Sequence, residues 1–382
     1  MSKLKIGIDA RLIGKQRTGD EAVFFGIAKS LAKIDRENEY FLFTDSIDRG
    51  DIKKIEERLG IAEKDNFKIV SIKARNKFYW NFWALPRFLR KNPVDIYLTQ
   101  YIVPFFVSEK IKIITIVHDI SFNFFSKFIK FSDLFFLKIL IPLSLRRADK
   151  ILGVSKFTRD EIIKYYKINP SKVDYFYNAV ADDFKKEYSR EDMDVIRRKY
   201  NLPEKFILYV GTLQPRKNIP LLIEGYAKIQ EKLGGIKLVL SGNKKSHNVD
   251  SRIERAVLKN YLKDSVVFTG FIDETDKPAI FEMAHVFVFP SLYEGFGIPI
   301  LEAFSKKTPV LASDIPSLRE VAENAALFVD PGDIDKFSKV LYDISINNQL
   351  REELVSLGCR RAEFFSWEKT AEKILNILQK IN

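Results

Sequence analysis

Two glutamates in the stretch YEGFGIPILEAF have the spacing to hold a ligand rich in hydroxyl groups. Glu294 and Glu302 are separated by seven residues, and two glycines and a proline lie between them. Proline is tolerated in the first turn of a helix, so we expect a helix to begin near Ile298 with its positive end beside the glycines. Backbone N–H groups of such a turn bind phosphate, and carboxylates accept hydrogen bonds from sugar or ribose hydroxyls. Alternatively, one glutamate caps the helix and the other is solvated.

A second cluster of reactive residue types follows the apolar run KFILYVGT. Gly211 and Thr212 turn the chain, and we expect Arg216 and Lys217 to open the next helix. A glycine, a hydroxyl, two cations and a helix N-terminus together predict an anion site suited to a diphosphate. The Gly-Lys-Ser/Thr ending of a P-loop is missing. The alternative is a solvated turn with two surface cations.

One of the three histidines is a candidate for a functional site. His118 ends a strong β pattern and lies next to Asp119. In parallel α/β sheets this is the edge that faces ligands. His247, in a polar stretch, and His285, at the start of an apolar run, are interpreted as structural.

Two acidic patterns invite comparison with metal ligands. DMD covers 192–194 and DID covers 333–335. The first falls in the expected interdomain stretch, and the second falls at an expected helix start, where Asp is a common cap. With three dispersed histidines and the single Cys359, we expect no metal site. One cysteine also excludes an internal disulfide and fits a reducing compartment.

The elements that must position these residues form a regular alternation. Apolar runs of strand length alternate with segments of helical spacing, and this pattern indicates parallel sheets covered on both faces. In the first half the runs are 4–10, 39–44, 67–72, 94–99, 111–119, 150–155 and 172–177. In the second half they are 205–212, 236–242, 266–272, 285–291, 309–314 and 326–331. The 382 residues therefore predict an α/β protein of two doubly wound domains, with a boundary in the charged stretch 182–203.

Charge is distributed unevenly between the two halves. The net charge is +12, and residues 1–200 hold 39 Lys+Arg against 27 Asp+Glu. A basic half suggests an anionic partner. The aromatic and basic runs 73–92 and 122–147 are interpreted either as membrane-surface helices or as ordinary amphipathic domain helices. We expect no nucleic acid as a partner, no signal peptide and no transmembrane span, because every apolar run is too short.

With these motifs the chain resembles the family 4, or group 1, retaining glycosyltransferases of the GT-B fold. EGFGIPILE is the E-x7-E hallmark of that family, and GTLQPRKN, VLSGNK, VVFTGFI, TPVLASD and ALFVDPGD follow in its order. IGIDARLIGKQRTG, TIVHDISF and ADKILGVSKFTRDEI match in the first half. The resemblance implies two Rossmann-like domains facing a cleft. They cover residues 1–185, with a closing helix at 366–382, and residues 200–365.

The resemblance also implies roles for single residues. Arg216 and Lys217 would bind the donor diphosphate, helped by Gly211 and Thr212. Glu302 would take the ribose hydroxyls. The remaining implied contacts are to the sugar (Glu294 and His118), to sugar and phosphate through the backbone (Gly295, Phe296, Gly297 and Ile298), to the base (Gly242, Phe271 and Ile272) and to the phosphates (Gly19).

The sequence departs from the family pattern in three places. Asp20 and Glu21 add negative charge to the loop after the first strand, where relatives have a second glycine and an arginine. Lys307 replaces a preferred glycine, for which we expect local strain. Ala179 also stands where glycine is usual.

The resulting expectation is a metal-independent hexosyltransferase without a cofactor. Its donor would be GDP-mannose first or a UDP-sugar second, and its acceptor a glycan or lipid-linked glycan. We expect it in the cytoplasm, with peripheral contact to an anionic membrane surface as one alternative. A GT-B sugar-phosphate synthase or phosphorylase, and a non-catalytic two-lobed sugar-binding protein, are the competing interpretations.

Overall fold

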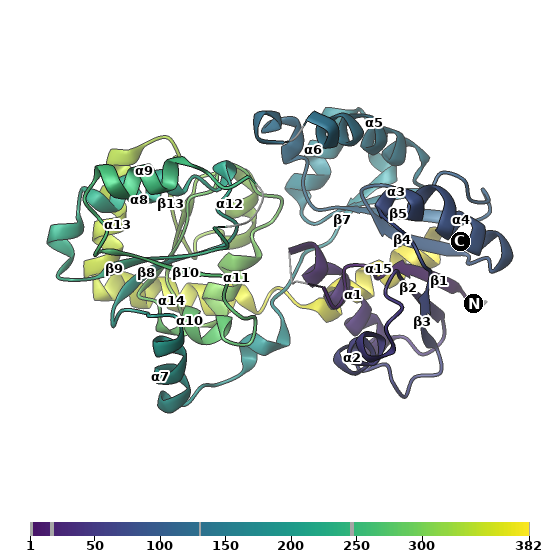
Figure 1. Ribbon diagram of the computed structural model, residues 1–382, viewed down its shortest axis with the longest axis horizontal. Coiled ribbons are helices and arrows are strands. Elements are labelled where there is room, and N and C mark those ends of the chain that lie inside the picture. The colour runs from purple at the N-terminus through teal and green to yellow at the C-terminus, as the bar shows by residue number, and fades with distance from the viewer. Residues whose placement is uncertain (1–2, 16–18, 130, 245–247, 382) are drawn as a thin grey trace. The chain divides into compact units, whose positions relative to one another are not determined.

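The computed structural model describes residues 3–15, 19–129, 131–244 and 248–381 and divides into two compact units (Figure 1). Unit 1 contains residues 1–124, 130–179 and 366–382. Unit 2 contains residues 125–129 and 180–365. Both units are α/β, as the alternation of apolar runs predicted.

The sheet of unit 1 has seven parallel strands in the order β3-β2-β1-β4-β5-β6-β7. Each of the seven apolar runs expected in the first half contains a strand. Most side chains of these strands are buried, because helices cover both faces of the sheet. The strands are β1 (Lys5–Asp9), β2 (Glu39–Thr44), β3 (Phe67–Ser71), β4 (Ile96–Gln100), β5 (Lys112–Val117), β6 (Lys150–Gly153) and β7 (Val173–Tyr175).

The helices of unit 1 separate onto the two faces of its sheet (Figure 1). One face carries α1 (Gly19–Ile34), α2 (Arg49–Leu59) and α15 (Trp367–Ile381). The other carries α3 (Lys77–Tyr79), the π-helical turn η1 (Trp80–Ala84), α4 (Leu85–Lys91), α5 (Phe131–Arg147) and α6 (Lys156–Tyr166). Short 3₁₀ turns occur at Ser121–Asn123, Ser126–Phe128 and Pro170–Lys172. This division follows from right-handed crossovers, because the strand order reverses direction after β3.

Helix α15 closes unit 1 although it comes last in the chain. It packs on α1, where a Cβ built at Gly26 would lie 2.4 Å from the Trp367 indole. The missing side chain lets the two helices approach closely. The Thr370 hydroxyl also donates a hydrogen bond of 2.5 Å to the carbonyl of Tyr177.

The sheet of unit 2 has six parallel strands in the order β10-β9-β8-β11-β12-β13. The strands are β8 (Phe206–Val210), β9 (Lys237–Ser241), β10 (Val266–Gly270), β11 (Val286–Phe289), β12 (Val310–Ser313) and β13 (Leu327–Val329). Each lies within one of the six apolar runs of the second half. The chain enters the unit at Val180, earlier than the stretch 182–203, and Phe184 packs on Phe281 with 5.9 Å between ring centroids.

Helices cover both faces of this sheet as well (Figure 1). On one face α8 (Ile219–Ala227) packs against α9 (Arg252–Lys259) and α13 (Ile334–Ile346). On the other, α11 (Ile298–Ser305) packs against α10 (Lys277–Met283) and α14 (Asn348–Ala362). The remaining helical segments are η5 (Asp182–Lys185), α7 (Arg190–Lys199), η6 (Pro215–Lys217), η7 (Gln230–Leu233) and α12 (Pro316–Ala322).

Two local expectations about the backbone are settled by this fold. Lys307 has φ +57°, so the strain expected where the family prefers glycine is present. Asp20 and Glu21 lie in the first turn of α1 and not in a loop, which corrects the expectation for that stretch. Over the described residues, no helix has both the length and the apolar character needed to cross a bilayer.

Candidate functional site

The order of strands in unit 2 creates a switch point between β8 and β11. From β8 the chain continues outward to β9 and β10, and from β11 it continues in the opposite direction to β12 and β13. The helices that follow β8 and β11 therefore lie on opposite faces of the sheet, and the loops at the strand ends diverge. Such a point is where open α/β sheets bind ligands. Both sequence clusters, 211–217 and 293–302, begin at this edge.

The two clusters meet through an ion-paired triad. Lys217 Nζ lies 2.5 Å from Glu294 Oε1, and Arg216 Nη1 lies 3.3 Å from Glu294 Oε2. Lys217 and Glu294 are buried, with 8% of each residue exposed, and Arg216 is partly buried. The structure thus brings the predicted diphosphate ligands and the predicted sugar ligand to one point. It places them in contact with one another, which the sequence analysis did not anticipate.

Backbone hydrogen bonds fix the two loops to each other. The Leu292 N–H donates to the Arg216 carbonyl at 2.8 Å, and Arg216 Nη1 donates to the Tyr293 carbonyl at 3.2 Å. The expectation that Arg216 and Lys217 open a helix is wrong. They end the 3₁₀ turn η6, and Asn218 with φ +54° separates them from α8. The left-handed residue breaks the helical path, so the cations are held by the β11 loop instead of by α8.

The electrostatics of the triad favour the ionised carboxylate. Burial opposes ionisation of Glu294, but the charges of Lys217 and Arg216 outweigh it and lower the pKa of Glu294 below its usual value. Behind the triad, burial raises the pKa of the Tyr209 phenol, and the hydroxyl donates to the Thr212 carbonyl at 2.7 Å. A charged triad at a buried strand edge is a common mark of a functional site.

The helix after the Gly-rich turn begins where the sequence predicted. Helix α11 starts at Ile298 with proline in its first turn. Its N-cap, Gly297, has φ +111° and provides no side-chain cap. A Cβ there would lie 2.7 Å from Leu318 Cδ2, so both the conformation and the space require glycine. The positive end of α11 is therefore directed at the triad edge without a capping side chain on Gly297.

The second glutamate of the motif has a partner that the sequence analysis missed. Glu302 is buried, and its Oε1 accepts a hydrogen bond from Lys277 Nζ at 2.6 Å. Lys277 opens α10, which comes two elements before α11 in the chain, and its Nζ lies 3.8 Å from Glu274 Oε2. In the sequence, FIDETDKPAI resembles an ordinary polar helix start. Only the packing of α10 on α11 could reveal the pair.

Three glycines end three neighbouring strands and leave a ledge without side chains. The Gly211 N–H donates to the Ser241 carbonyl, and the Gly242 N–H donates to the Gly270 carbonyl, each at 3.0 Å. A Cβ at Gly242 would lie 2.3 Å from the Gly211 carbonyl oxygen, so glycine is required there. Gly270, with φ +73°, was not singled out from the sequence. The ledge permits close approach of a flat group to the backbone.

The other predicted donor residues border this edge with different exposures. Phe271 follows β10 and is 49% exposed, whereas Ile272 is buried. Thr212 is exposed at the end of β8. Phe296 is buried and packs on Phe365 with 5.6 Å between ring centroids. An exposed phenylalanine beside a glycine ledge suits the stacking of an aromatic base.

The predicted residues of unit 1 also gather at one edge of their own sheet. His118 directly follows β5, and its Nε2 lies 2.9 Å from Gln100 Oε1 at the end of β4. Its Nδ1 lies 3.7 Å from Asp20 Oδ1, next to Gly19 at the start of α1. The ring packs near Tyr101, with 5.6 Å between centroids. A Cβ at Gly19 would meet nothing within 4 Å.

Asp20 and Glu21, which depart from the family pattern, have different contacts in the structure. Asp20 faces His118, as described. Glu21 is buried and its Oε1 accepts a hydrogen bond from the Gly14 N–H at 3.2 Å, with Arg58 at 3.5 Å. Glu21 thus holds the loop after β1 against α1, and of these two carboxylates Asp20 is the one that lies near His118.

His285 and the two acidic patterns fall outside this constellation. His285 Nε2 is hydrogen-bonded to the Ser345 carbonyl at 2.8 Å, whereas His247 lies outside the described residues. Asp192 completes a capping box at α7, and Asp333 caps α13. Within the described ranges, no group of three or more His, Cys, Asp or Glu side chains is arranged to hold a metal ion.

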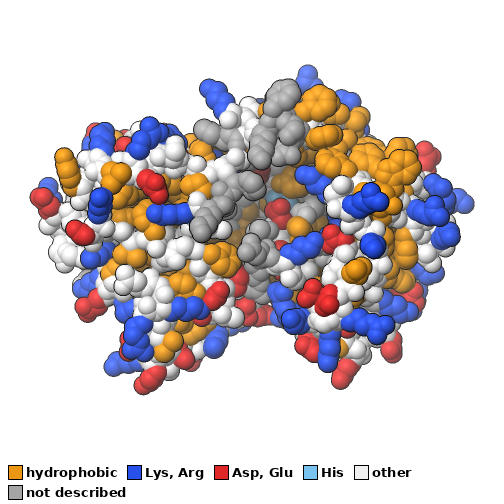
Figure 2. All heavy atoms as spheres, viewed as in Figure 1, with side chains coloured by type: hydrophobic (Ala, Val, Ile, Leu, Met, Phe, Trp, Pro, Cys, Tyr) orange, Lys and Arg blue, Asp and Glu red, His pale blue; other side chains and the backbone are white. Residues whose placement is uncertain are grey.

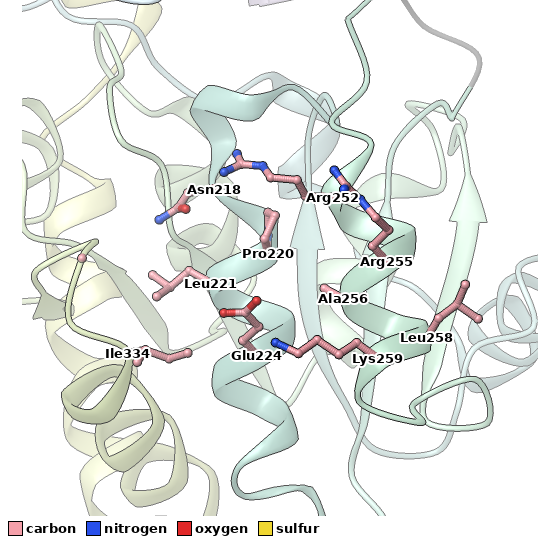
Figure 3. Close-up of a pocket in the computed structure, with 11 residues that line it drawn as sticks. Asn218, Pro220, Leu221, Glu224, Arg252, Arg255, Ala256, Leu258, Lys259 and Ile334 are labelled. Carbon is pink, nitrogen blue, oxygen red and sulfur yellow. The ribbon is translucent and has the colours of Figure 1, made fainter.

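A cavity of about 810 Å³ opens on another part of unit 2 and contains none of the predicted residues. Figure 3 shows it between α8 and α9, with Glu224 and Lys259 pointing toward each other across it. Arg252 at its rim is paired with Asp250 at 2.8 Å. The cavity touches the triad region only through Asn218, so it gives no support to the site at the switch point and does not replace it.

Comparisons with known proteins match both halves of the chain. The family model described as "Glycosyl transferases group 1" matches residues 192–358, and the model described as "Glycosyltransferase Family 4" matches residues 18–184. The O-antigen chain mannosyltransferase B of Escherichia coli is 32% identical over 267 residues, which cover 69% of each chain. The O-antigen chain mannosyltransferase RfbU of Salmonella typhimurium is 28% identical over 269 residues and 70% of each chain.

Solved structures share the fold over nearly the whole length. A sucrose-phosphate synthase of Thermosynechococcus elongatus superposes with a TM-score of 0.77 at 19% identity, covering 99% of each chain. The HepE protein of Anabaena, solved in complex with UDP-glucose, gives a TM-score of 0.75 at 18% identity. That match covers 99% of this chain and 100% of HepE. At these identities the likeness concerns the fold and not the ligands.

Proposed function

This chain belongs to the group 1 glycosyltransferases of family 4, has the GT-B fold and is a hexosyltransferase, and we propose that it transfers mannose from a nucleotide-sugar donor with retention of configuration. The observation that carries the proposal is the Arg216–Lys217–Glu294 triad at the switch point between β8 and β11. Two cations, a carboxylate and a helix N-terminus converge there on one edge.

Each component of the edge matches one part of a nucleotide-sugar. Arg216 and Lys217 would bind the diphosphate, because charge-assisted hydrogen bonds to phosphate are strong. The donor phosphate then replaces Glu294 as a partner of the cations, and the carboxylate becomes available to sugar hydroxyls. The uncapped start of α11 supports the same phosphate.

The nucleoside would occupy the part of the edge over β8 to β10. Glu302, held by Lys277 at 2.6 Å, offers its carboxylate to the ribose hydroxyls. The base would lie on the ledge of Gly211 and Gly242, beside the exposed ring of Phe271. His118 and Gly19 of unit 1 are proposed to serve the sugar and the phosphates, respectively.

In the proposed reaction the acceptor oxygen forms a bond to the anomeric carbon as the bond from that carbon to the phosphate oxygen breaks. The leaving phosphate takes the bonding electron pair and accepts the proton of the acceptor hydroxyl. The products are a glycoside and a nucleoside diphosphate, and all bonds and protons of the reaction are accounted for. Arg216 and Lys217 would stabilise the charge that develops on the leaving oxygen. No side chain has to act as a strong base, and no metal or cofactor is required.

The names of the relatives favour mannose as the transferred sugar. Both O-antigen mannosyltransferases are matched over more than two thirds of their length. GDP-mannose is therefore the first donor proposed and a UDP-sugar the second. The acceptor would be a glycan or lipid-linked glycan, with the enzyme in the cytoplasm, where nucleotide-sugars are made.

The test is a donor screen with purified protein and a mannosylated glycan acceptor. GDP-mannose, UDP-glucose and UDP-N-acetylglucosamine are compared, and the anomeric configuration of the product is read by NMR. Transfer from GDP-mannose with retention supports the proposal. Transfer only from UDP-sugars would replace the donor, and an inverted product would exclude the mechanism. Tight binding of free sugar without any transfer would favour a non-catalytic binding protein.

A further inference from the structure

Unit 1 exposes a group of large apolar side chains on one face. The aromatic surface is defined here as Tyr79, Trp83, Phe106, Phe135, Phe136, Ile139 and Leu143, each between 41% and 67% exposed. Figure 2 shows hydrophobic side chains gathered at the upper right, where Figure 1 has α3, α4 and α5, with Lys and Arg beside them. This is the sheet face opposite α1 and α15. A contiguous exposed apolar patch commonly marks an interaction site.

Ring contacts link the chain segments that carry the aromatic surface. Phe78 of α3 and Phe136 of α5 have ring centroids 4.7 Å apart. Phe82 of η1 lies 6.1 Å from Phe106, in the loop after β4. The exposed rings are therefore fixed on folded elements and form one surface, instead of scattered apolar residues.

Helix α5 is apolar both toward the core and toward solvent. Ile141 and Leu145 are fully buried. Phe135, Ile139 and Leu143, spaced four residues apart and thus on one side of the helix, are 54%, 42% and 43% exposed. A helix that only covers a sheet carries polar residues on its outer side. Folding of unit 1 does not account for this outer stripe.

The segment that carries α3, η1 and α4 is rich in cations and contains no acidic residue. The sequence has no Asp or Glu from 66 to 94, and six cations lie between 73 and 91. Lys73, Arg75, Lys77, Arg87, Arg90 and Lys91 are all exposed. Over the described part of the chain, none of these six forms an ion pair with a carboxylate. Their positive charge is therefore available to an external anion.

We propose that the aromatic surface and its basic border dock unit 1 onto an anionic lipid bilayer. Aromatic and aliphatic side chains that insert at the headgroup boundary, flanked by Lys and Arg, are the features of interfacial binding. A second copy of this chain fits less well. In a two-fold dimer the same patch meets itself, so the basic borders would face each other and repel. Stable attachment without a spanning helix requires both an apolar and an electrostatic contribution, and both are present here.

The aromatic surface lies where docking to a bilayer would assist delivery of an acceptor. Phe106 lies in the loop that follows β4, and Tyr101 in the same loop packs near His118. The docked surface thus borders the sheet edge that carries His118. Delivery of a lipid-linked acceptor from the bilayer to this edge rests on the proposed function, whereas the docking itself does not.

The experiment uses flotation of the full-length protein with vesicles. Phosphatidylcholine vesicles are compared with vesicles that contain about 30% phosphatidylglycerol, at low and high salt. Trp83 also serves as an internal reporter. It is 67% exposed, whereas Trp80 and Trp367 are 0% and 9% exposed, so a blue shift of emission on vesicle binding would come from Trp83. We expect at least tenfold stronger partition onto anionic vesicles, weakened by salt, with a blue shift.

Matched variants distinguish vesicle binding through the aromatic surface from non-specific adsorption through other exposed residues. Trp83→Ser with Phe106→Ser should lower partition at least tenfold, whereas Tyr261→Ser with Leu258→Ser should leave it unchanged. Tyr261 and Leu258 are 93% and 54% exposed on unit 2. Arg87→Glu with Arg90→Glu should abolish the preference for anionic lipid. Lys232→Glu with Lys263→Glu makes the same change in net charge elsewhere and should have little effect.

The results distinguish a lipid bilayer from a second copy of the chain as the binding partner of the aromatic surface. Equal partition of wild type and the Trp83/Phe106 variant, or equal partition onto neutral and anionic vesicles, would overturn the proposal. A doubling of mass in light scattering that is lost in the same variant would assign the surface to a second copy instead. Transfer to a soluble acceptor should be unchanged in all four variants. A failure of vesicle binding therefore remains distinct from a failure of the proposed transferase chemistry.

Discussion

Lys217 Nζ lies 2.5 Å from Glu294 Oε1, although the two residues are 77 positions apart in the chain. The contact joins the loop after β8 to the loop after β11, and both side chains are buried. A buried charge is stable only with a partner, so each side chain holds the other in place until a ligand arrives. The proposed donor phosphate would take over Lys217 and release the carboxylate.

Replacement of Lys217 by methionine should therefore destabilise unit 2. Lys217→Met leaves the buried Glu294 carboxylate with Arg216 as its remaining cation, and we expect a loss of about 3 kcal/mol in the free energy of unfolding. Glu294→Gln in the same chain should restore part of this loss. Urea unfolding of both single variants and the double variant measures the coupling. The exposed pair Lys199–Asp273 is the control and should show little coupling. Strict additivity at 217 and 294 would contradict the buried pair.

The lowered pKa of Glu294 predicts a pH dependence of stability. Because the folded-state pKa lies below the usual 4.5, ionisation of Glu294 adds stability above pH 4.5, and this contribution is lost as the pH falls through the folded-state value. Wild type and Glu294→Gln should therefore differ most in unfolding free energy near pH 7 and converge on acidification. Urea titrations from pH 7 to pH 3 measure this difference. A constant difference across that range would mean that Glu294 does not titrate as argued.

Arg216→Ala should slow sugar transfer more than it weakens donor binding. The guanidinium is partly exposed, so folding should change little, but the charge on the leaving phosphate grows as the glycosidic bond breaks. Loss of one preorganised electrostatic partner costs about 10²–10³ in rate. Single-turnover transfer and nucleotide affinity are measured together, with Arg255→Ala at the rim of the separate cavity as control. A wild-type rate at saturating donor would remove Arg216 from the chemistry.

Glu302→Ala should weaken binding of the nucleoside diphosphate. Loss of hydrogen bonds between ribose and a charged acceptor costs about 1.5–3 kcal/mol, or roughly ten- to hundredfold in dissociation constant. Lys277→Met should weaken binding less, because Lys277 positions the carboxylate and is not proposed to contact the ribose. A 2′,3′-dideoxy nucleotide should bind both variants and wild type with similar affinity. Calorimetry that finds unchanged affinity for Glu302→Ala would exclude this residue from the site.

Transfer should survive removal of divalent metal. The proposed mechanism stabilises the leaving phosphate with Arg216, Lys217 and the start of α11, so EDTA should change the rate less than twofold. Initial rates are compared before and after chelation and after addition of Mn²⁺. An EDTA-inactivated enzyme that Mn²⁺ restores would show that a metal carries part of the charge.

The sequence alone determined the class of fold and the chemical types at the site. Strands buried on both faces must be continuously apolar, so their positions are visible as runs, and each expected run contains a strand. The E-x7-E spacing likewise indicated the start of α11 at Ile298, because glycine and proline have strong local preferences. These features depend on neighbouring residues in the chain and can be inferred without knowledge of the fold.

The tertiary structure decided which of these residues meet. Nothing local orders β8 beside β11, and this pairing brings Lys217 into contact with Glu294. The pairing of α10 with α11 introduced Lys277 beside Glu302 in the same way. The helix expected to begin at Arg216 does not form there, because Asn218 adopts φ +54° and separates Arg216 from α8, while the loop after β11 is hydrogen-bonded to the Arg216 carbonyl. Contacts between residues distant in sequence depend on strand order, and strand order is set by the packing of the whole sheet.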